Sequence, residues 1–165
     1  MSPLPDVRTG LGWDSHRLAE GRDLILGGVR IDSPVGLDGH SDADVLAHAV
    51  IDALLGAAGL GDIGEHFPDT DERWRGADSI ALLRHVAGLL GGDGWTIGNV
   101  DATVVLERPK LGPHKAEMET RLAAAIGIDA ARVNVKATTA ERLDAVGRGE
   151  GAVAQAVATI LRPAS

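Results

Sequence analysis

The amino-acid sequence predicts one domain of mixed α/β type, and three observations support this. The chain has 165 residues, close to the length of about 150 residues that one domain commonly has. Its 44% hydrophobic and 24% charged residues are typical of a globular protein. Stretches with apolar residues at helical spacing alternate with runs of β-branched residues. We therefore expect a single domain over residues 1–165, with a loose tail at residues 1–6.

The β-branched runs place the strands. Residues 7–13 predict a first strand, and residues 24–31 predict a hairpin around a Gly-Gly turn. Residues 95–106 and 133–138 predict two more strands, because valine and threonine favour extended backbone. Residues 151–161 suit either class, because alanine and valine alternate there.

Three stretches have the periodicity of amphipathic helices. These are residues 45–58, 78–90 and 113–126. Ser41 or Asp42 is a candidate N-cap for the first of them, and Gly59 ends it. Between the first two helices, residues 65–77 predict a loop.

Composition excludes several functional classes. The chain has no cysteine, so it has no disulfide, iron–sulfur cluster or cysteine nucleophile, and we expect a cytoplasmic protein. The net charge of −8 and the 2% of aromatic residues argue against a nucleic-acid partner. No apolar stretch approaches the roughly 20 residues of a membrane helix, so we expect no membrane partner.

The first candidate site consists of Asp14, His16 and His48. In a strand, Asp14 and His16 point to one face because the side-chain period is two. Two imidazoles and a carboxylate suit a catalytic zinc ion that keeps an open coordination position. The alternative is that Asp14 caps a turn and His48 is an ordinary surface histidine.

Acidic residues accompany His48 on the first helix. Asp44, His48 and Asp52 are spaced four residues apart and share a helix face, so a carboxylate could accept the free ring N–H of His48. Asp52 could equally belong to a solvated polar stripe. Asp42 and Asp44 have the spacing of a metal-chelating pair, although acidic residues near a helix start more often serve as caps.

Two glycine-containing segments have different interpretations. Residues 59–64 match the G-x-G-x-x-G pattern of dinucleotide folds, but they follow a helix instead of a strand, so we interpret them as a helix stop and loop. Residues 136–141 offer a lysine, hydroxyls and Glu141, which suit a phosphate and a hard cation such as Mg²⁺. Residues 147–151 alone predict a surface turn with an Arg–Glu pair.

In their order and spacing from about residue 8 to residue 161, these segments resemble the 2-C-methyl-D-erythritol 2,4-cyclodiphosphate synthase family of the non-mevalonate isoprenoid pathway. The matching strings include Gly12-Trp13-Asp14-Ser15-His16, His40-Ser41-Asp42-Ala43-Asp44, Phe67-Pro68-Asp69-Thr70-Asp71, Gly76-Ala77-Asp78-Ser79, Val133-Asn134-Val135-Lys136-Ala137-Thr138-Thr139 and Gly147-Arg148-Gly149-Glu150-Gly151. The resemblance implies an α+β fold in which helices cover one face of a small mixed sheet, with residues 151–161 as a strand. It also implies a homotrimer whose sheets surround a central cavity and whose active sites lie between subunits.

The resemblance further implies a phosphorus–oxygen lyase. The 2-phosphate of 4-diphosphocytidyl-2-C-methyl-D-erythritol 2-phosphate would attack the β-phosphorus of the same molecule and release CMP. Zinc would bind Asp14, His16 and His48, magnesium or manganese would bind Glu141, and His40 and Thr139 would stabilise the transition state. The methylerythritol contacts would be Ser41, Asp62, Ile63, Gly64, Phe67, Asp69 and Asp71. The cytidine contacts would be Leu106, Pro109, Lys110, Leu111, Gly112 and Thr138, and Arg148 would bind a phosphate in the central cavity.

The sequence departs from the family pattern at a few positions. Many members have phenylalanine where Trp13 and Ala145 stand, glycine where Asp144 stands, and a bulkier residue where Gly112 stands. The departures at Trp13, Ala145 and Asp144 leave open whether an isoprenoid diphosphate binds in the central cavity. Two other functions are compatible with the same scaffold: a metal-dependent phosphohydrolase of a nucleotide diphosphate, and a non-catalytic trimer that binds a nucleotide or an isoprenoid diphosphate.

Overall fold

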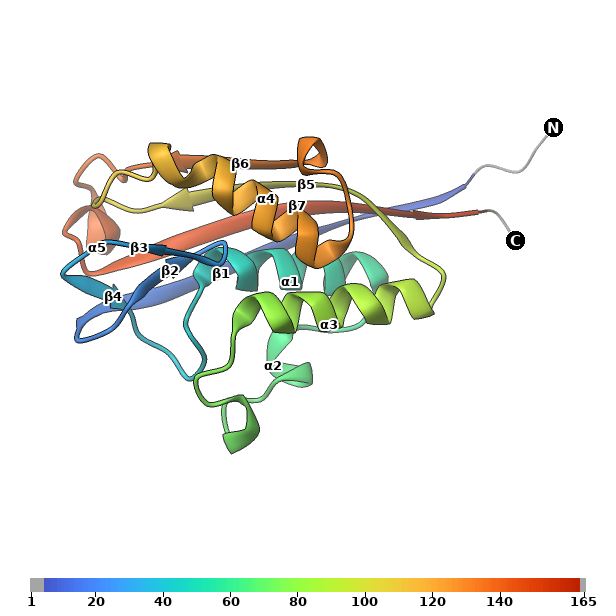
Figure 1. Cartoon of the computed structure of the whole chain (residues 1–165), viewed down its shortest axis with the longest axis horizontal. Helices are drawn as coiled ribbons and strands as arrows, with labels where there is room; N and C mark the ends of the chain where they lie inside the picture. Colours follow the sequence, from blue (N-terminus) through green and yellow to red (C-terminus); the bar gives the residue numbers. More distant parts are fainter. Residues whose placement is uncertain (1–4, 164–165) are drawn as a thin grey trace.

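The computed structural model describes residues 5–163, which form a mixed β-sheet with helices on one face (Figure 1). The strands are β1 (Asp6–Glu20), β2 (Leu24–Leu26), β3 (Val29–Ile31), β4 (Val35–Leu37), β5 (Thr96–Val105), β6 (Val133–Thr138) and β7 (Gly151–Arg162). The α-helices are α1 (Val45–Ala58), α2 (Ile63–His66), α3 (Ser79–Gly92), α4 (Lys115–Ile126) and α5 (Asp144–Gly147), with short 3-10 turns at Glu72–Trp74, Gly112–His114 and Ala130–Arg132.

The main sheet has the strand order β4-β1-β7-β5-β6. Strands β5 and β6 are parallel, and the other neighbours in this sheet are antiparallel. Strands β2 and β3 form a separate hairpin, as the Gly-Gly signal predicts. The ambiguous residues 151–161 form β7 at the centre of the sheet, which agrees with the resemblance. The expected α+β fold with a mixed sheet is therefore confirmed.

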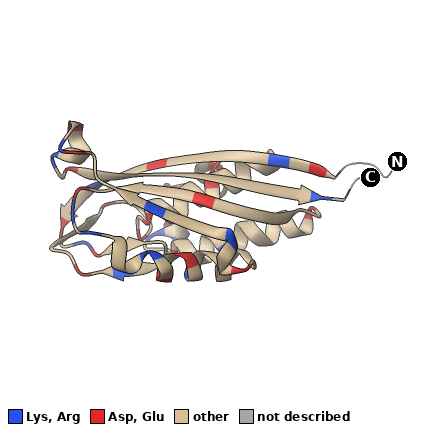
Figure 2. Ribbon diagram, turned by 90° about the horizontal axis from the view of Figure 1, so that it is seen from above, with Lys and Arg blue, Asp and Glu red and all other residues tan. Residues whose placement is uncertain are grey.

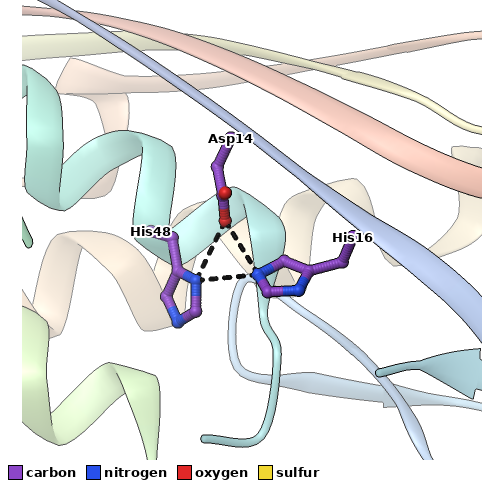
Figure 3. Close-up of side chains that lie close together, drawn as sticks. All are labelled: Asp14, His16 and His48. Carbon is purple, nitrogen blue, oxygen red and sulfur yellow. Dashed lines mark hydrogen bonds and ion pairs between the residues drawn. The ribbon is translucent and has the colours of Figure 1, made fainter. Parts of the chain in front are cut away.

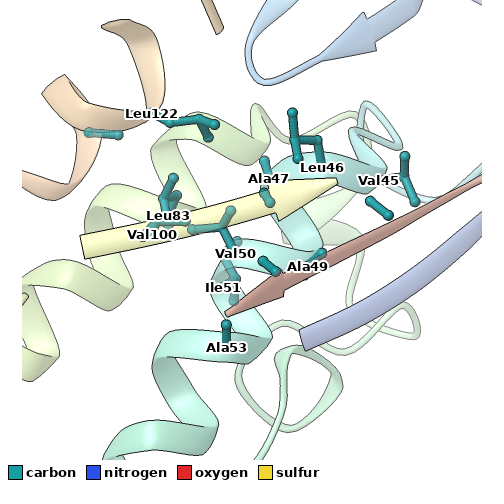
Figure 4. Packing of buried hydrophobic residues seen from close by; sticks show 14 of the residues in the cluster. Val45, Leu46, Ala47, Ala49, Val50, Ile51, Ala53, Leu83, Val100 and Leu122 are labelled. Atoms are coloured by element: carbon teal, nitrogen blue, oxygen red, sulfur yellow. The ribbon is translucent and has the colours of Figure 1, made fainter. Parts of the chain in front are cut away.

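The hydrophobic core lies between the sheet and helices α1, α3 and α4 (Figure 4). Leu46 and Val50 of α1 are fully buried there, together with Leu83 of α3, Val100 of β5 and Leu122 of α4. Most residues of α1 are buried, because the helix runs between the sheet and α3. A helix that is apolar on nearly every side needs such an enclosed position.

Two glycines of β1 allow α1 to lie against the strand backbone. A Cβ atom at Gly12 would overlap the carbonyl oxygen of Ala49 and would lie 2.7 Å from the nitrogen of Ala53. A Cβ at Gly10 would likewise overlap the Ala53 carbonyl oxygen. Since β1 and α1 carry all three residues of the predicted metal cluster, these glycines determine how closely its two halves approach.

Strand β1 differs from the prediction at both ends. It begins at Asp6, whose register partner is Arg162, so Asp6 is not part of a loose tail; residues 1–4 of that tail lie outside the described residues. It continues to Glu20 beyond the predicted end at Trp13, because its second half pairs with both β7 and β4. The three-residue strand β4 was not predicted, since its sequence contains glycine and is short.

The N-terminus of α1 also differs from the prediction. The N-cap is Asp44, whose side chain accepts the backbone N–H of Ala47, and not Ser41 or Asp42. The predicted stop at Gly59 is confirmed, because Gly59 has a φ of 74° and closes the helix in the left-handed conformation. Helix α3 ends at Gly92, two residues later than the predicted end at Leu90, and Asp93 is its C-cap.

The face of the sheet opposite the helices carries exposed apolar side chains. Leu11 and Trp13 of β1 are 68% and 54% exposed, and Val157 of β7, the register partner of Leu11, is 40% exposed. Val7 and its partner Leu161 extend this patch, which we call the apolar face. In Figure 2, acidic and basic residues are interspersed over the described ribbon, and neither kind gathers alone in one region. None of the helices between residues 5 and 163 is both long and apolar enough to span a membrane.

Candidate functional site

The predicted cluster of Asp14, His16 and His48 is assembled at the junction of β1 and α1 (Figure 3). The Asp14 Oδ2 atom lies 2.9 Å from His48 Nδ1 and 3.0 Å from His16 Nε2. The two nitrogens are 3.3 Å apart. One ligand atom from each residue lies within 4.8 Å of the others, so the three side chains could hold one metal ion. The prediction that these residues meet in space is confirmed.

The residues of the cluster shift one another's pKa values. Burial raises the pKa of Asp14, but the hydrogen bonds and charges of both histidines outweigh this effect and lower the pKa to about 2. Burial lowers the pKa of His16, and the hydrogen bond and charge of Asp14 outweigh it, so the net effect is a raised pKa. The carboxylate is therefore ionised at neutral pH and attracts positive charge, whether a proton or a metal ion.

Each histidine is also held at its other ring nitrogen. His16 Nδ1 lies 2.8 Å from the carbonyl oxygen of Asp38, and His48 Nε2 lies 2.8 Å from Ser79 Oγ. A carbonyl oxygen can only accept, so His16 Nδ1 carries a proton, which leaves Nε2 as the ring nitrogen that would bind a metal ion in place of its contact with Asp14. This donor set fits a zinc ion, because ligating histidines usually donate their second ring N–H to a fixed acceptor.

The expectation that Asp44 or Asp52 accepts the free ring N–H of His48 is wrong. The Asp44 carboxylate accepts hydrogen bonds from the backbone N–H groups of Gly27, Gly28 and Ala47, and Asp52 accepts one from Ile63. Asp44 is fully buried, and burial raises its pKa to about 6. Asp44 therefore fastens the β2–β3 hairpin to the start of α1. Asp42 and Asp44 do not chelate a metal together, because they bond to different partners.

A cleft of about 440 Å³ opens beside the cluster. Its lining includes the predicted residues His40, Ser41, Ile63, Gly64, Phe67 and Asp69 in addition to the three cluster residues. We call it the metal cleft. The structure therefore brings most of the predicted methylerythritol contacts to the predicted metal ligands.

Two predicted contacts do not line the metal cleft. Asp62 caps α2 by accepting the N–H of Glu65, and the Asp71 carboxylate pairs with Arg73 at 2.6 Å. The backbone of Asp71 nevertheless supports the cleft, because His40 Nε2 lies 3.1 Å from its carbonyl oxygen.

The lining also contains residues that the sequence did not indicate, namely Gly39, Pro68, Trp74 and Leu82. Trp74 packs edge-on against Phe67, and its Nε1 is buried with no hydrogen-bond partner among the described residues. The only signal for Trp74 and Leu82 is their apolar character, which also fits an ordinary core position.

A second cleft of about 410 Å³ lies beyond the ends of β5 and β6, and we call it the nucleotide cleft. All six predicted cytidine contacts line it, namely Leu106, Pro109, Lys110, Leu111, Gly112 and Thr138. Thr139 and Glu141 line it as well, and Thr139 Oγ1 donates to Glu141 Oε1 at 3.2 Å. Glu107, which lies within the predicted loop, and Lys115, which was not predicted, complete the polar lining.

One chain does not bring the two predicted catalytic residues together. His40 lines the metal cleft and Thr139 lines the nucleotide cleft, and the two clefts share no lining residue. Arg148 lies in neither cleft and pairs with Glu150 at 2.6 Å, as the surface-turn interpretation predicts. Asp144 has a φ of 53°, which explains why glycine suits this position in the family pattern.

Comparison with known proteins agrees with this geometry. The 2-C-methyl-D-erythritol 2,4-cyclodiphosphate synthase of Desulfosudis oleivorans is 61% identical over 155 residues, which are 94% of this chain and 92% of that protein. The bifunctional enzyme IspD/IspF of Anaeromyxobacter dehalogenans is 57% identical over 96% of this chain, and the chain spans 41% of that protein's length.

A solved structure of a 2C-methyl-D-erythritol-2,4-cyclodiphosphate synthase in its CDP-bound form has the same fold. It superposes with a TM-score of 0.85 at 43% identity and covers 93% of this chain and 99% of that one. The family profile described as the YgbB family matches residues 7–161. The chain therefore belongs to the YgbB family.

Proposed function

We propose that this chain, as a 2-C-methyl-D-erythritol 2,4-cyclodiphosphate synthase, cyclises 4-diphosphocytidyl-2-C-methyl-D-erythritol 2-phosphate with the residues of its two clefts. An oxygen of the 2-phosphate bonds to the β-phosphorus, the bond from that phosphorus to the bridging oxygen breaks, and CMP leaves with this oxygen. No protein nucleophile is needed, because phosphoryl transfer depends mainly on positioning and charge neutralisation. The observation that carries the proposal is the Asp14, His16 and His48 cluster at the wall of a cleft.

We assign a zinc ion to Asp14, His16 and His48, and a magnesium or manganese ion to Glu141 together with substrate phosphates. The nitrogen and carboxylate donors of the first set suit zinc, and the lone carboxylate of Glu141 suits a hard cation that keeps oxygen ligands. When bound, these ions polarise phosphoryl oxygens and offset their negative charge. The chain has a net charge of −8, so a polyanionic substrate requires such local positive charge.

The protein side chains position the substrate. In the metal cleft, the His40 ring and the Ser41 hydroxyl lie next to the cluster, where they can donate hydrogen bonds to phosphate oxygens. Apolar Phe67 and Ile63 form the wall that can cover the methylerythritol carbons. We assign the role of stabilising charge in the transition state to His40 and Thr139, since donors aimed at developing charge lower the barrier.

The nucleotide cleft is our assignment for the cytidine phosphate. Lys110 and Lys115 supply positive charge there, and backbone groups around Gly112 can read the edge of the base. The structural relative in its CDP-bound form supports a nucleotide ligand for this fold. A cleft next to the ends of two parallel strands is also a common place for nucleotides to bind.

We propose that three chains assemble through the apolar face, so that the metal cleft of one subunit meets the nucleotide cleft of the next. Two observations support this assembly. The apolar face exposes Leu11, Trp13 and Val157 to solvent in a single chain, and contiguous exposed apolar patches mark contact surfaces. In addition, His40 and Thr139 line separate clefts within one chain, so one chain alone does not form the complete site. A cytoplasmic location stays a prediction from composition.

Phosphorus NMR of the purified protein with the diphosphocytidyl substrate and Mg²⁺ tests the proposed function. We expect a cyclic diphosphate with equimolar CMP, and we expect a zinc chelator to suppress both. A linear phosphate product with CMP would indicate that water attacks instead, and the protein would be a phosphohydrolase. Bound substrate without turnover would identify a non-catalytic binding protein.

A further inference from the structure

A buried chain of hydrogen bonds lies behind His48. The Nδ1 atom of His48 faces the cluster, 2.9 Å from Asp14 Oδ2. The opposite ring nitrogen, Nε2, lies 2.8 Å from Ser79 Oγ and 3.2 Å from Ser41 Oγ. Ser79 is completely buried and His48 is 8% exposed, so water does not compete for these bonds. The serine stands at the first turn of α3, 31 residues from the histidine that it contacts.

The direction of these bonds follows from Asp42. The Ser79 hydroxyl donates to Asp42 Oδ1, and the Ser79 backbone N–H donates to Asp42 Oδ2 at 3.0 Å. A carboxylate can only accept, so the single hydroxyl proton of Ser79 points toward Asp42. Ser79 therefore presents lone pairs to His48, and Nε2 must carry a proton to make this bond. Nδ1 is then the ring nitrogen left for a metal ion, which would replace any proton that Nδ1 shares with Asp14 in the metal-free protein.

Ser41 does not duplicate this role. Its oxygen accepts the backbone N–H of Ala43 at 3.2 Å, and its contact with His48 Nε2 is 0.4 Å longer than that of Ser79. No carboxylate is bonded to its hydroxyl among the described contacts, so the direction of its proton is not determined in the same way. Ser41 also lines the metal cleft, where its hydroxyl can contact a ligand.

We propose that Ser79 and Asp42 are positioning residues that fix the tautomer and ring orientation of His48 and so prepare Nδ1 to bind the metal ion. The proposal rests on the metal site of the proposed function. His16 has the equivalent support from the carbonyl oxygen of Asp38, with the nitrogens exchanged, so each histidine leaves one defined ring nitrogen for the same metal ion. Removing such outer partners typically weakens metal binding by about 10- to 100-fold.

The substitution Asp42→Asn tests the direction of the bonds with little change in shape. An asparagine must place its NH₂ group either in the place of Oδ2, against the backbone N–H of Ser79, or in the place of Oδ1, against the Ser79 hydroxyl and the more distant backbone N–H of Asp44. Only the hydroxyl can turn to accept this bond, and it then donates its proton to His48 Nε2. The histidine is driven to the opposite tautomer, with the proton on Nδ1 where the metal would bind. We expect the affinity for Zn²⁺ to fall by about 10- to 100-fold.

Two measurements on the full-length protein test the effect. Competition with a chromophoric chelator gives the Zn²⁺ affinity, and long-range proton–nitrogen NMR of the metal-free protein gives the tautomer of His48. We expect His48 Nε2 to carry a proton in the wild type and to lose it in Asp42→Asn, while Nδ1 can share a proton with the Asp14 carboxylate in both metal-free proteins. A change that only loosened the fold would weaken binding without this specific loss of the Nε2 proton.

Asp78→Asn is the matched control. Asp78 caps the same helix by accepting the N–H of Ile80, and the structure shows no contact between its carboxylate and His48. Aspartate and asparagine cap helices about equally well, so Zn²⁺ affinity should stay within about twofold of the wild type. If Asp42→Asn also stays within twofold and keeps the Nε2–H tautomer, the proposal is wrong.

Ser79→Ala keeps the proposal testable if Asp42→Asn does not fold. It leaves Ser41 as the only hydroxyl at Nε2, and we expect about 10-fold weaker Zn²⁺ binding with a mixture of tautomers. Unchanged affinity and tautomer would overturn the proposal. If the wild type itself binds no Zn²⁺, the metal assignment of the proposed function fails, whereas the NMR measurement still decides whether Ser79 and Asp42 set the tautomer.

Discussion

Gly12→Ala should damage both the stability of the fold and the metal site, because Gly12 lies where α1 touches β1. The added Cβ would overlap the Ala49 carbonyl oxygen and would lie 2.7 Å from the nitrogen of Ala53. Both are backbone atoms of a buried helix, so no flexible side chain can move aside. The helix must move away from the strand, and Ala49 is adjacent to His48 in the chain.

The structure gives the size of the effect. Bringing the contact with the Ala53 nitrogen from 2.7 Å to the 3.4 Å of ordinary packing requires a movement of at least about 0.7 Å, and the closer contact with the Ala49 oxygen requires more. Overfilling a packed interior usually costs about 1–3 kcal/mol, and a backbone obstacle places Gly12→Ala at the upper end of this range. Metal sites tolerate ligand shifts of about 0.2 Å, so the same movement carries His48 out of range of an ion bound to Asp14.

Gly56→Ala is the control, because Gly56 lies on the same helix with no atom within 4 Å of its added Cβ. It should gain about 0.5–1 kcal/mol from the higher helix propensity of alanine. Urea unfolding followed by circular dichroism gives the free energies of unfolding, and elemental analysis gives the zinc content. A Gly12→Ala protein within about 0.5 kcal/mol of the wild type and with full zinc content would refute the packing argument.

Three further predictions follow from the sites. Thr139→Ala should lower kcat by about 100- to 1,000-fold with little change in CMP affinity by calorimetry, because one transition-state donor is lost; weaker CMP binding at an unchanged kcat would contradict this role. Leu11→Asp should convert the proposed trimer to monomers in analytical ultracentrifugation, because it places a charge at the centre of the apolar face; a stable trimer would contradict the proposed interface. Burial raises the pKa of Asp44 from 3.8 to about 6, so the folded chain binds this proton more tightly than the unfolded chain, and the resulting stability is lost as the pH rises through this range. Asp44→Asn lacks this dependence, so its deficit in unfolding free energy should be larger at about pH 4.5 than at about pH 7, and an equal deficit would contradict the raised pKa.

Local patterns predicted most of the secondary structure because they reflect local physics. The apolar spacing of α1 and its stop at Gly59 are confirmed, and so is the hairpin around Gly27 and Gly28. The sequence alone does not indicate which distant segments pair with one another. The length of β1 depends on its partners β7 and β4, and the start of α1 depends on which acidic side chain the hairpin engages, which is Asp44.

The same distinction separates the predicted and missed parts of the site. The strand period of two placed Asp14 and His16 on one face, but only the tertiary structure brings His48 to them. The partner of His48 was sought at helical spacing on its own helix, whereas the structure supplies Ser79 from another helix. A bond across 31 residues leaves no periodic trace in a single sequence.

The arrangement of the cluster explains why small apolar residues matter as much as the ligands. Two ligands come from β1 and one from α1, so the ligand geometry is as precise as the packing between these elements, which is set at Gly12. The groups behind the ligands come from other segments: the carbonyl of Asp38 holds His16, and Ser79 holds His48. Each imidazole is thus fixed before any ion arrives, which lowers the reorganisation that binding requires. In a chain with a net charge of −8, this fixed site is what lets positive charge accumulate beside a phosphorylated substrate, so loss of the ion should weaken substrate binding as well as slow the reaction.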